Sequence, residues 1–200
     1  MEFDLNGEHK RYAYKLLAGL ITPRPIAWVT TQDENGVVNA APFSFFNVFG
    51  TRPPILGFAP GDKEPGIPKD TARNIRRTGE FVVNLVDEAS AEVMNQSSQE
   101  LDHGISEVAL LKLETTPSVG ISPPRLTIAP VALECREWST LEIGQNRLVI
   151  GLTDRIHTRA GVLDPDSLLV NPDAFSPIGR MEVPSGYCRT RDRFQMTRPD

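Results

Sequence analysis

The sequence is poor in the residues that most often carry metal or nucleophilic chemistry. It has two cysteines and three histidines among 200 residues. Cys135 and Cys188 lie far apart and form no Cys-x-x-Cys pair, and His9, His103 and His157 show no ligand spacing, so the sequence predicts no metal site. We interpret both cysteines as small buried side chains in a reducing cytoplasm.

The chain also lacks an excess of positive charge and long apolar runs. Its formal net charge is −5, and it has no basic stripe that could collect the phosphates of a nucleic acid. The first fifteen residues carry charges where a signal peptide has an apolar core. No apolar stretch reaches the length of a membrane span. The sequence therefore predicts a cytoplasmic protein that binds neither nucleic acid nor membrane.

Familiar catalytic motifs are missing as well. The sequence has no Gly-x-Ser-x-Gly elbow, no P-loop and no Gly-x-Gly-x-x-Gly at the start of a helix. His157 ends a strand-like run and could point into a site, but a structural histidine with satisfied hydrogen bonds is the simpler interpretation. If the chain is an enzyme, a cofactor should carry the chemistry.

Glycine and proline, by contrast, are abundant, with fifteen and seventeen residues. They separate short β-branched runs, which is typical of a chain with many strands and turns. Asp33-Glu34-Asn35-Gly36 is predicted as a hairpin turn, with Asn-Gly supplying positive φ. The runs predicted as strands are 26–32, 37–41, 55–59, 80–86, 131–138, 147–157 and, less regularly, 167–171.

Two segments, 69–78 and 87–98, have the pattern of helices, and a short helix is also expected over 11–17. Asp70 and Thr71 are candidate caps for the first, and Gly79 is its stop signal. The stretch 105–130 is predicted as irregular connection. With no repeat or linker, residues 1–200 are predicted to form one domain. We expect a mostly β fold, a closed or half-closed barrel with helical decorations.

The segment 39–47 is the first candidate for ligand binding. Ala40 and Ala41 would let a flat ring approach the backbone, and Pro42 interrupts the strand ladder so that neighbouring N–H groups could face a ligand. The alternative is a strand that enters the core with its aromatics packed inward. The remaining candidates for the walls and polar contacts are Phe43, Ser44, Phe45, Phe46 and Asn47.

Two further segments could contact an anion. The start of the helix at Lys69 offers unpaired N–H groups to a phosphate, with Lys69, Thr71 and Arg73 adding charge and a hydroxyl. The alternative is ordinary capping beside exposed basic residues. In the Gly-punctuated tail, Tyr187 and Arg189 could close over a phosphate or a ring edge. A solvated tail is the alternative there.

Taken together, these segments resemble the FMN-binding split-barrel flavin reductases, the flavin reductase-like proteins that include flavoredoxin. The resemblance covers nearly the whole chain, and the order and spacing of the motifs make it specific. One departure concerns Arg180, because family members typically continue with a paired glycine where this chain has 181–184. The matching stretches are Pro23-Arg24-Pro25-Ile26-Ala27-Trp28-Val29, 39–47, 69–75, 80–85, 130–135 and Tyr187-Cys188-Arg189-Thr190.

The resemblance implies a six-stranded Greek-key split barrel that is usually a homodimer, with FMN held near the subunit interface. It implies that 41–47 line the isoalloxazine and the ribityl chain, and that Thr30 and Thr31 contribute hydroxyls. Tyr187 and Arg189 would approach from the tail or across the dimer. The implied phosphate contacts are Lys69, Thr71, Arg73 and Asn74.

The function implied is an oxidoreductase that accepts a hydride from NADH or NADPH onto FMN. Electrons would then pass to free flavin, a ferric complex, a quinone or a partner protein such as an oxygenase. A non-catalytic FMN carrier reduced by another protein is the second hypothesis. A barrel of the same shape that oxidises a phosphorylated form of vitamin B6 is the third, and the Ala-Pro-x-Ser-Phe-Phe-Asn run favours the reductase over it.

Overall fold

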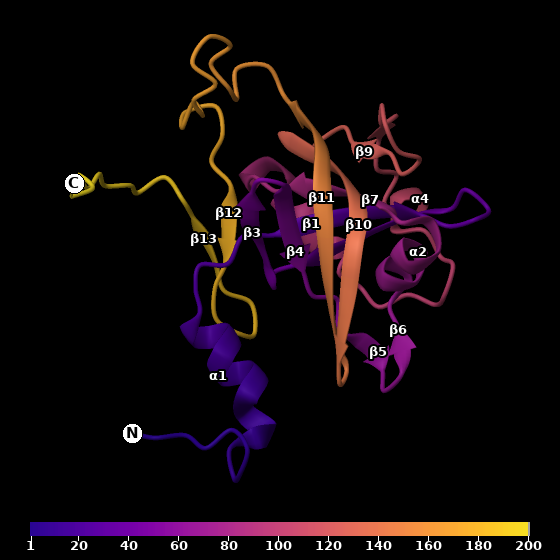
Figure 1. Cartoon of the computed structure of the whole chain (residues 1–200), viewed down its shortest axis with the longest axis vertical. Coiled ribbons are helices and arrows are strands. Elements are labelled where there is room, and N and C mark those ends of the chain that lie inside the picture. The colour runs from indigo at the N-terminus through magenta and orange to yellow at the C-terminus, as the bar shows by residue number, and fades with distance from the viewer. Residues whose placement is uncertain (200) are drawn as a thin grey trace.

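Apolar and β-branched residues alternate through the chain and build one antiparallel sheet of seven strands in the order β2-β1-β7-β10-β11-β4-β3 (Figure 1). The structure is a computed structural model and describes residues 1–199. The strands are β1 (Ala27–Gln32), β2 (Val38–Phe43), β3 (Phe46–Thr51), β4 (Pro54–Phe58), β7 (Glu80–Leu85), β10 (Val131–Ile143) and β11 (Asn146–Thr158).

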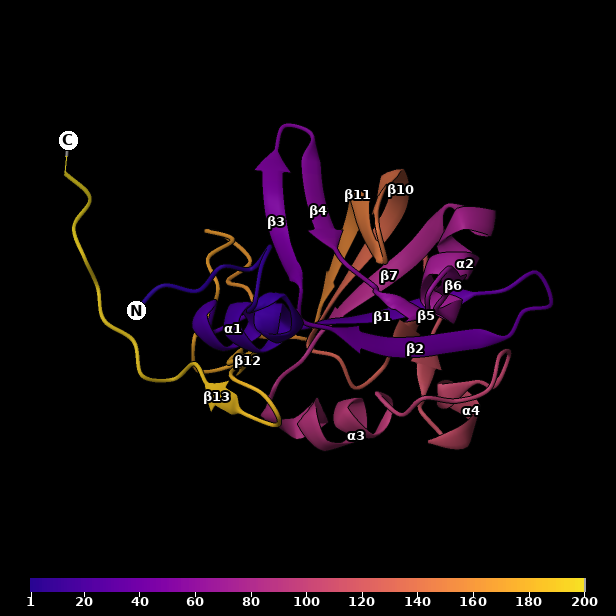
Figure 2. The ribbon, with the colours of Figure 1, turned by 90° about the horizontal axis from the view of Figure 1, so that it is seen from below.

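The sheet closes on itself because one stretch of chain supplies both of its edges. β2 and β3 stand at opposite ends of the strand order, yet only Ser44 and Phe45 separate them in sequence. The β3–β4 hairpin therefore turns away from β1 and β2 (Figure 2), and Ala59 N–H donates to Phe45 O at 2.9 Å near the bend. Counted as one bent strand, 38–51 makes a six-stranded split barrel. The predicted mostly β fold with helical decorations is confirmed.

Successive side chains of a strand point to opposite faces of the sheet, so the two faces pack into different apolar clusters. Val29 faces the barrel interior, where Phe58 stacks between Phe43 and Phe81 at ring-centroid distances of 5.3 and 5.5 Å. A side chain at Gly151 would overlap the Phe81 ring, so this strand position has to be glycine. Trp28 faces the outer side, in a second cluster covered by helical segments and loops.

Helices and short strand pairs cover this outer side and the ends of the barrel (Figures 1 and 2). No helix within residues 1–199 is long and apolar enough to cross a bilayer. The helical elements are η1 (Lys10–Tyr12), α1 (Ala13–Leu20), α2 (Asp70–Thr78), η2 (Glu88–Ser90), α3 (Ala91–Gln96) and α4 (Glu107–Leu110). The strand pairs are β5 (Asp62–Glu64) with β6 (Ile67–Pro68), β8 (Thr115–Thr116) with β9 (Arg125–Leu126), and β12 (Ile178–Arg180) with β13 (Tyr187–Arg189).

Several local predictions need correction. The stretch 87–98 is not one regular α-helix, because a capping box of Asp87 and Ser90 starts a 3₁₀ turn at Glu88–Ser90 that leads directly into α3. The stretch 105–130 contains α4, β8 and β9 rather than irregular chain alone, and in the described chain 167–171 forms no strand beyond a single bridge at Val170. Cys135 is buried as expected, but Cys188 is only half-buried.

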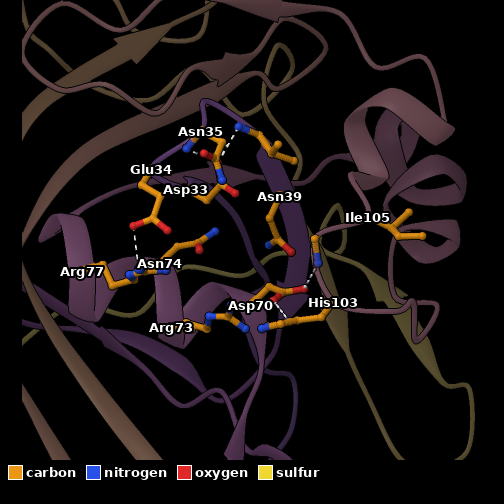
Figure 3. A pocket seen from close by; sticks show the side chains of 12 residues that line it. Asp33, Glu34, Asn35, Asn39, Asp70, Arg73, Asn74, Arg77, His103 and Ile105 are labelled. Carbon is orange, nitrogen blue, oxygen red and sulfur yellow. Dashed lines mark hydrogen bonds and ion pairs between the residues drawn. The ribbon is translucent and has the colours of Figure 1, made fainter.

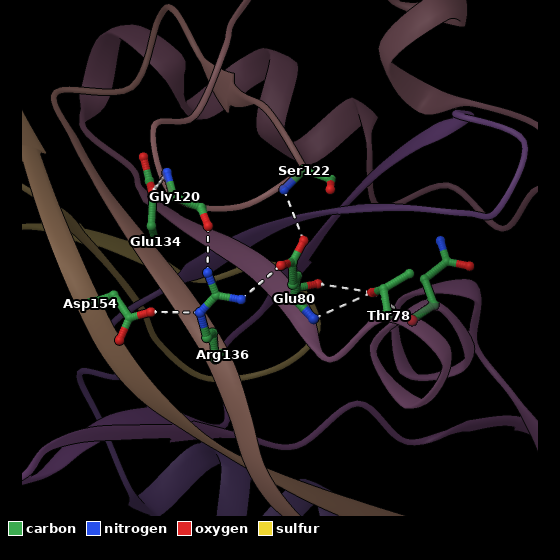
Figure 4. Close-up of polar contacts among 8 residues, drawn as sticks. Thr78, Glu80, Gly120, Ser122, Glu134, Arg136 and Asp154 are labelled. Carbon is green, nitrogen blue, oxygen red and sulfur yellow. Dashed lines mark hydrogen bonds and ion pairs between the residues drawn. The ribbon is translucent and has the colours of Figure 1, made fainter.

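The loop between β8 and β9 is fastened to the sheet by two carboxylates, the buried Glu134 and the partly exposed Glu80 (Figure 4). Glu134 accepts hydrogen bonds from the N–H groups of Val119 and Gly120, both at 2.8 Å, and contacts His157 Nε2 at 2.6 Å. Glu80 accepts from Ser122 N–H at 2.8 Å. His157 therefore takes part in this loop attachment through Glu134, which agrees with the structural interpretation of this histidine.

Candidate functional site

A cavity of about 450 Å³ opens between the edge strand β2, the start of α2 and the segment 97–103. Its volume lies in the range of small-molecule sites. Five predicted ligand residues line it: Ala41, Pro42, Phe43, Lys69 and Thr71. The other lining residues are Asn39, Lys63, Glu64, Ile67, Pro68, Asp70, Ser97, Ser98, Gln99, Glu100, Leu101, Asp102, His103 and Glu107.

The apolar wall of the cavity comes from β2. This strand pairs only with β1 and so presents one unpaired edge. Pro42 can occupy that edge because it needs to donate no ladder hydrogen bond there. Lys69 Nζ lies 6.0 Å from the Phe43 ring centroid, which places a cation beside the apolar wall. A flat ligand with an anionic end matches this pairing.

The start of α2 supplies donors at the other side of the cavity. Lys69 takes the N-cap position in extended conformation, and within residues 1–199 its side chain makes no capping hydrogen bond. Capping by Asp70 or Thr71 was therefore a wrong prediction: Asp70 forms an ion pair with His103 instead. The first N–H groups of the helix remain available, and together with the positive end of its dipole they favour an anion. At its other end α2 stops at Gly79 in the left-handed conformation, as predicted.

The deep end of the cavity is a polar cluster of Asn39, Thr71 and Glu107. The Asn39 amide donates to Glu107 Oε2 at 3.3 Å and accepts from Thr71 Oγ1 at 3.0 Å, and Ala40 N–H donates to Glu107 Oε2 at 3.0 Å. All three side chains are buried. Burial raises the pKa of Glu107, and the nearby Asp70 raises it further, while the hydrogen bond from Ala40 opposes both.

Sequence reasoning missed Glu107. It begins the four-residue helix α4 inside the stretch predicted as irregular, where Ser106 caps the helix by accepting from Ala109 N–H at 3.1 Å. A serine before a short acidic run is a weak signal for a helix start. Nothing local in the sequence indicates that this carboxylate meets β2, sixty-seven residues earlier along the chain.

A second cavity of about 230 Å³ lies next to the first and shares Asn39, Asp70 and His103 with it (Figure 3). The predicted phosphate residues Arg73 and Asn74 line this second cavity. Asp70 and its partner His103 stand between the two spaces. The structure thus divides the four residues predicted to bind phosphate between the two cavities. Lys69 and Thr71 line the first cavity, and Arg73 and Asn74 line the second.

The predicted threonines have structural partners. Thr31 Oγ1 accepts from Asn74 Nδ2 at 3.1 Å, and both side chains are buried, so the pair holds α2 against β1. Thr30 points to the opposite face of the sheet and donates to Pro124 O at 2.6 Å. Neither threonine belongs to the lining of the first cavity.

The segment 44–47 lies beyond the cavity, in and after the bend between β2 and β3. Ser44 accepts from Arg24 Nε at 3.4 Å, and Phe45 lies beside the same guanidinium, which is 5.7 Å from its ring centroid. Phe46 packs against the barrel core, and Asn47 is exposed. In one copy of the chain, these four predicted residues do not join Ala41, Pro42 and Phe43 around the cavity.

The tail residues are also placed elsewhere in a single chain. Tyr187 Oη donates to Asn95 Oδ1 at 3.2 Å, and Arg189 Nε donates to Glu88 at 2.8 Å. These contacts fasten β12–β13 to η2 and α3, on the side of the barrel away from α2, β5 and β6 (Figure 1). A role across a dimer stays a prediction for both.

The segment 97–105 covers the cavity and is tied down from two sides. Lys63 Nζ donates to Leu101 O at 2.6 Å, and His103 pairs with Asp70 at the start of α2. Because both ties are exposed or partly exposed side-chain contacts, each contributes only about 1 kcal/mol or less.

A protein-family model described as flavin reductase like domain matches residues 19–179 of the chain. The chain belongs to this family. The matched range contains the whole seven-stranded sheet and the cavity, and the predicted resemblance to flavin reductase-like proteins is confirmed.

Solved structures agree with this membership of the flavin reductase-like family. The 2-nitrobenzoate 2-nitroreductase NbaA of Pseudomonas fluorescens is 37% identical and covers 100% of this chain and 96% of its own, with a TM-score of 0.90. Nitrilotriacetate monooxygenase component B from Bacillus cereus is 30% identical, covers 98% of each chain and has a TM-score of 0.92. Flavoredoxin of Desulfovibrio vulgaris (Miyazaki F), at 18% identity, 98% and 97% coverage and a TM-score of 0.77, shares the fold.

Proposed function

We propose that this flavin reductase-like protein is an oxidoreductase that holds FMN in the larger cavity and accepts a hydride from NADH or NADPH. One observation carries the proposal. The same cavity joins an apolar wall at Ala41, Pro42 and Phe43 to the uncapped start of α2 with Lys69 and Thr71. A flavin mononucleotide has a matching flat apolar end and anionic end.

The cavity offers donors and an apolar wall to this cofactor, and its acidic side chains are Glu64, Asp70, Glu100, Asp102 and Glu107. Lys63 and Lys69 place two cations on the cavity wall, and the Thr71 hydroxyl and the first N–H groups of α2 add donors for a phosphate. The small Ala41 side chain lets a ring approach the backbone of the edge strand. When bound, FMN supplies the hydride and electron chemistry. The chain then has to bind it, orient it and keep water away.

The acceptor of the electrons is proposed to be free flavin, a ferric complex or a partner protein. A partner protein is supported by the similarity to nitrilotriacetate monooxygenase component B, whose name describes one part of a larger enzyme. The similarity to NbaA, named as a 2-nitrobenzoate 2-nitroreductase, favours a nitroaromatic compound as a second candidate acceptor.

We further propose that the protein works as a homodimer. Large apolar side chains are exposed on α1 and on β3, among them Leu20, Ile21, Val48 and Phe49, which are 61–77% exposed. Exposed large apolar side chains that gather on one face are a common mark of a protein–protein interface. A partner seated there would also lie next to the 44–47 segment, which would bring its predicted residues to a shared site.

Purified protein mixed with FMN tests the proposal. We expect binding to quench flavin fluorescence, and rapid mixing with NADH or NADPH to bleach the visible flavin absorbance. Binding without bleaching by either nucleotide would favour the non-catalytic FMN carrier. Absence of any flavin binding would reject the cofactor and the reductase function together.

A further inference from the structure

A third cavity lies where the β8–β9 pair meets the start of β10 and the end of β11. Its volume is about 180 Å³, and it shares no lining residue with the two cavities beside α2. Sites that enclose whole cofactors or drug-sized ligands are usually larger. A ligand held in this cavity would therefore be small.

The lining of this third cavity is basic, although the chain as a whole is acidic. Arg125, His157 and Arg159 line it, and none of its lining residues within 1–199 carries a carboxylate. By contrast, the formal net charge of the chain is −5, and both cavities beside α2 have acidic lining residues. Basic side chains around a small concave space favour a negatively charged ligand.

Two of these three basic side chains already have acidic partners outside the lining. Arg159 Nη2 donates to Asp87 Oδ2 at 3.1 Å, and His157 Nε2 contacts Glu134 Oε1 at 2.6 Å. Arg125 is different, because it forms no ion pair with a carboxylate in the part of the chain that the structure describes. The positive charge of Arg125 is the one that a ligand would compensate.

Arg125 also has an unused hydrogen-bond donor. Its Nη2 donates to Pro117 O at 3.2 Å, but its Nε is buried and has no hydrogen-bond partner among residues 1–199. A buried donor in this state costs about 1–3 kcal/mol. A water molecule could accept the hydrogen bond, but only an anion would also compensate the charge of the guanidinium.

Threonine hydroxyls add donors to the same space. The Oγ1 atoms of Thr116 and Thr127 lie 2.9 Å apart, so one hydroxyl proton joins the pair and the other is free for a further acceptor. Thr158, at the end of β11, also lines the cavity. A guanidinium fork together with several hydroxyls suits a ligand that has several oxygens, as a phosphoryl group has.

We propose that this third cavity is a binding site for a small phosphoryl group, either inorganic phosphate or the phosphate of a small phosphomonoester. Arg125 supplies the principal charge and the guanidinium donors, and the threonine hydroxyls supply the remaining donors. The site is separate from the cavity proposed for FMN, and its ligand does not depend on the proposed function.

The first test follows the Arg125 side chain by nuclear magnetic resonance in the full chain. The Arg125 Nε–H resonance is identified by its absence in Arg125→Lys. Inorganic phosphate, added at constant ionic strength, should shift this resonance until it saturates, whereas sodium chloride should leave it in place. A resonance that ignores phosphate, or that moves equally with chloride, would overturn the proposal.

The second test measures the affinity for inorganic phosphate by calorimetry. All proteins carry Lys69→Ala, because the start of α2 is a second place where phosphate could bind. Arg125→Gln should weaken binding about tenfold, the value of one hydrogen bond between charged groups. Arg198→Gln removes an exposed arginine outside the cavity and should leave the affinity unchanged. Equal affinities in all three proteins would reject Arg125 as the phosphate contact.

A third variant tests the cavity without changing its charge. Ala129 lines it and is half-buried, so Ala129→Leu should fill part of the space and weaken phosphate binding at least as much as Arg125→Gln. This variant tests the site even if Arg125→Gln folds poorly. Phosphate affinity unchanged by Ala129→Leu would place the anion outside this cavity.

The source of the phosphoryl group is tested with glycerol 3-phosphate in the same titrations. Tighter binding of the ester than of inorganic phosphate would assign the site to phosphomonoesters, and the reverse would assign it to the free ion. If neither ligand shifts the Arg125 resonance, the proposal is wrong. Failure of the protein to bind FMN, in contrast, would reject the proposed function and leave this site unaffected.

Discussion

Glu134 and Glu107 are both buried glutamates, but their surroundings act in opposite directions. Glu134 is fully buried, and burial by itself would raise its pKa; two backbone N–H groups and His157 outweigh this and lower it. Burial raises the pKa of Glu107, with Asp70 adding to the rise, and the hydrogen bond from Ala40 N–H does not outweigh them. A carboxylate whose donors outweigh its burial fastens a loop, whereas one whose burial dominates beside a cavity is a candidate for function.

The same contrast applies to the regions around them. The loop attachment around Glu134 is filled by the protein's own N–H groups, so no ligand is needed to complete it (Figure 4). At the cavity, the start of α2 leaves N–H donors without capping partners among residues 1–199, and the segment tied by Lys63 and His103 covers them. The loop attachment is thus complete within the chain, whereas the cavity offers donors that the proposed ligand would use.

The largest expected effect comes from removing the satisfied carboxylate. Glu134→Ala leaves two partly buried N–H groups and His157 without their acceptor, so the free energy of unfolding should fall by about 3 kcal/mol. Urea denaturation measures this. Glu114→Ala, at an exposed position, is the matched control and should change stability by less than about 0.5 kcal/mol. Equal losses of unfolding free energy in the two variants would mean that the hydrogen bonds of Glu134 contribute nothing beyond those of an exposed glutamate.

An intermediate effect is expected at the open end of the barrel. Lys69→Ala removes a cation beside the proposed phosphate position, and FMN affinity should fall about tenfold, while riboflavin affinity stays unchanged. Fluorescence titration with both ligands measures the two affinities. Lys10→Ala, an exposed lysine outside the cavity, should alter neither. Equal loss for both ligands would place the phosphate away from α2.

The sequence predicts the core strands of the barrel better than the surroundings of the cavity. The β-branched runs around Trp28 and Val83 form β1 and β7 within a residue or so of expectation, because their burial follows from a local period of two. The predicted wall at 41–43 and the start of α2 also meet as expected. Each of these features is encoded by neighbouring residues.

Features that depend on distant partners could not be predicted in this way. Glu107 has a role only because β2 lies against α4, and Asp70 leaves the capping position because His103 reaches it from the covering segment. Thr30 and Thr31 are adjacent and chemically alike, yet the pleat sends one to Pro124 and the other to Asn74. Choosing between them requires the strand register and the elements packed on each face.

The smallest expected effect is a pH dependence of stability that has opposite signs for Glu134 and Glu107. The Glu134 pKa is lowered in the folded state, so its stabilisation is present above the unfolded pKa of about 4.3 and is lost as pH falls through the folded pKa. The Glu107 pKa is raised, so its cost to stability grows as pH rises above the unfolded pKa and is complete above the folded pKa. Relative to wild type, Glu134→Gln should become more destabilising as pH rises toward about 4.3. Glu107→Gln should become more stabilising as pH rises above that value, by less than about 1 kcal/mol. Urea denaturation of the three proteins from about pH 2 to about pH 8 measures both slopes. Slopes of the same sign would mean that burial alone, and not the number of donors, decides how each glutamate titrates.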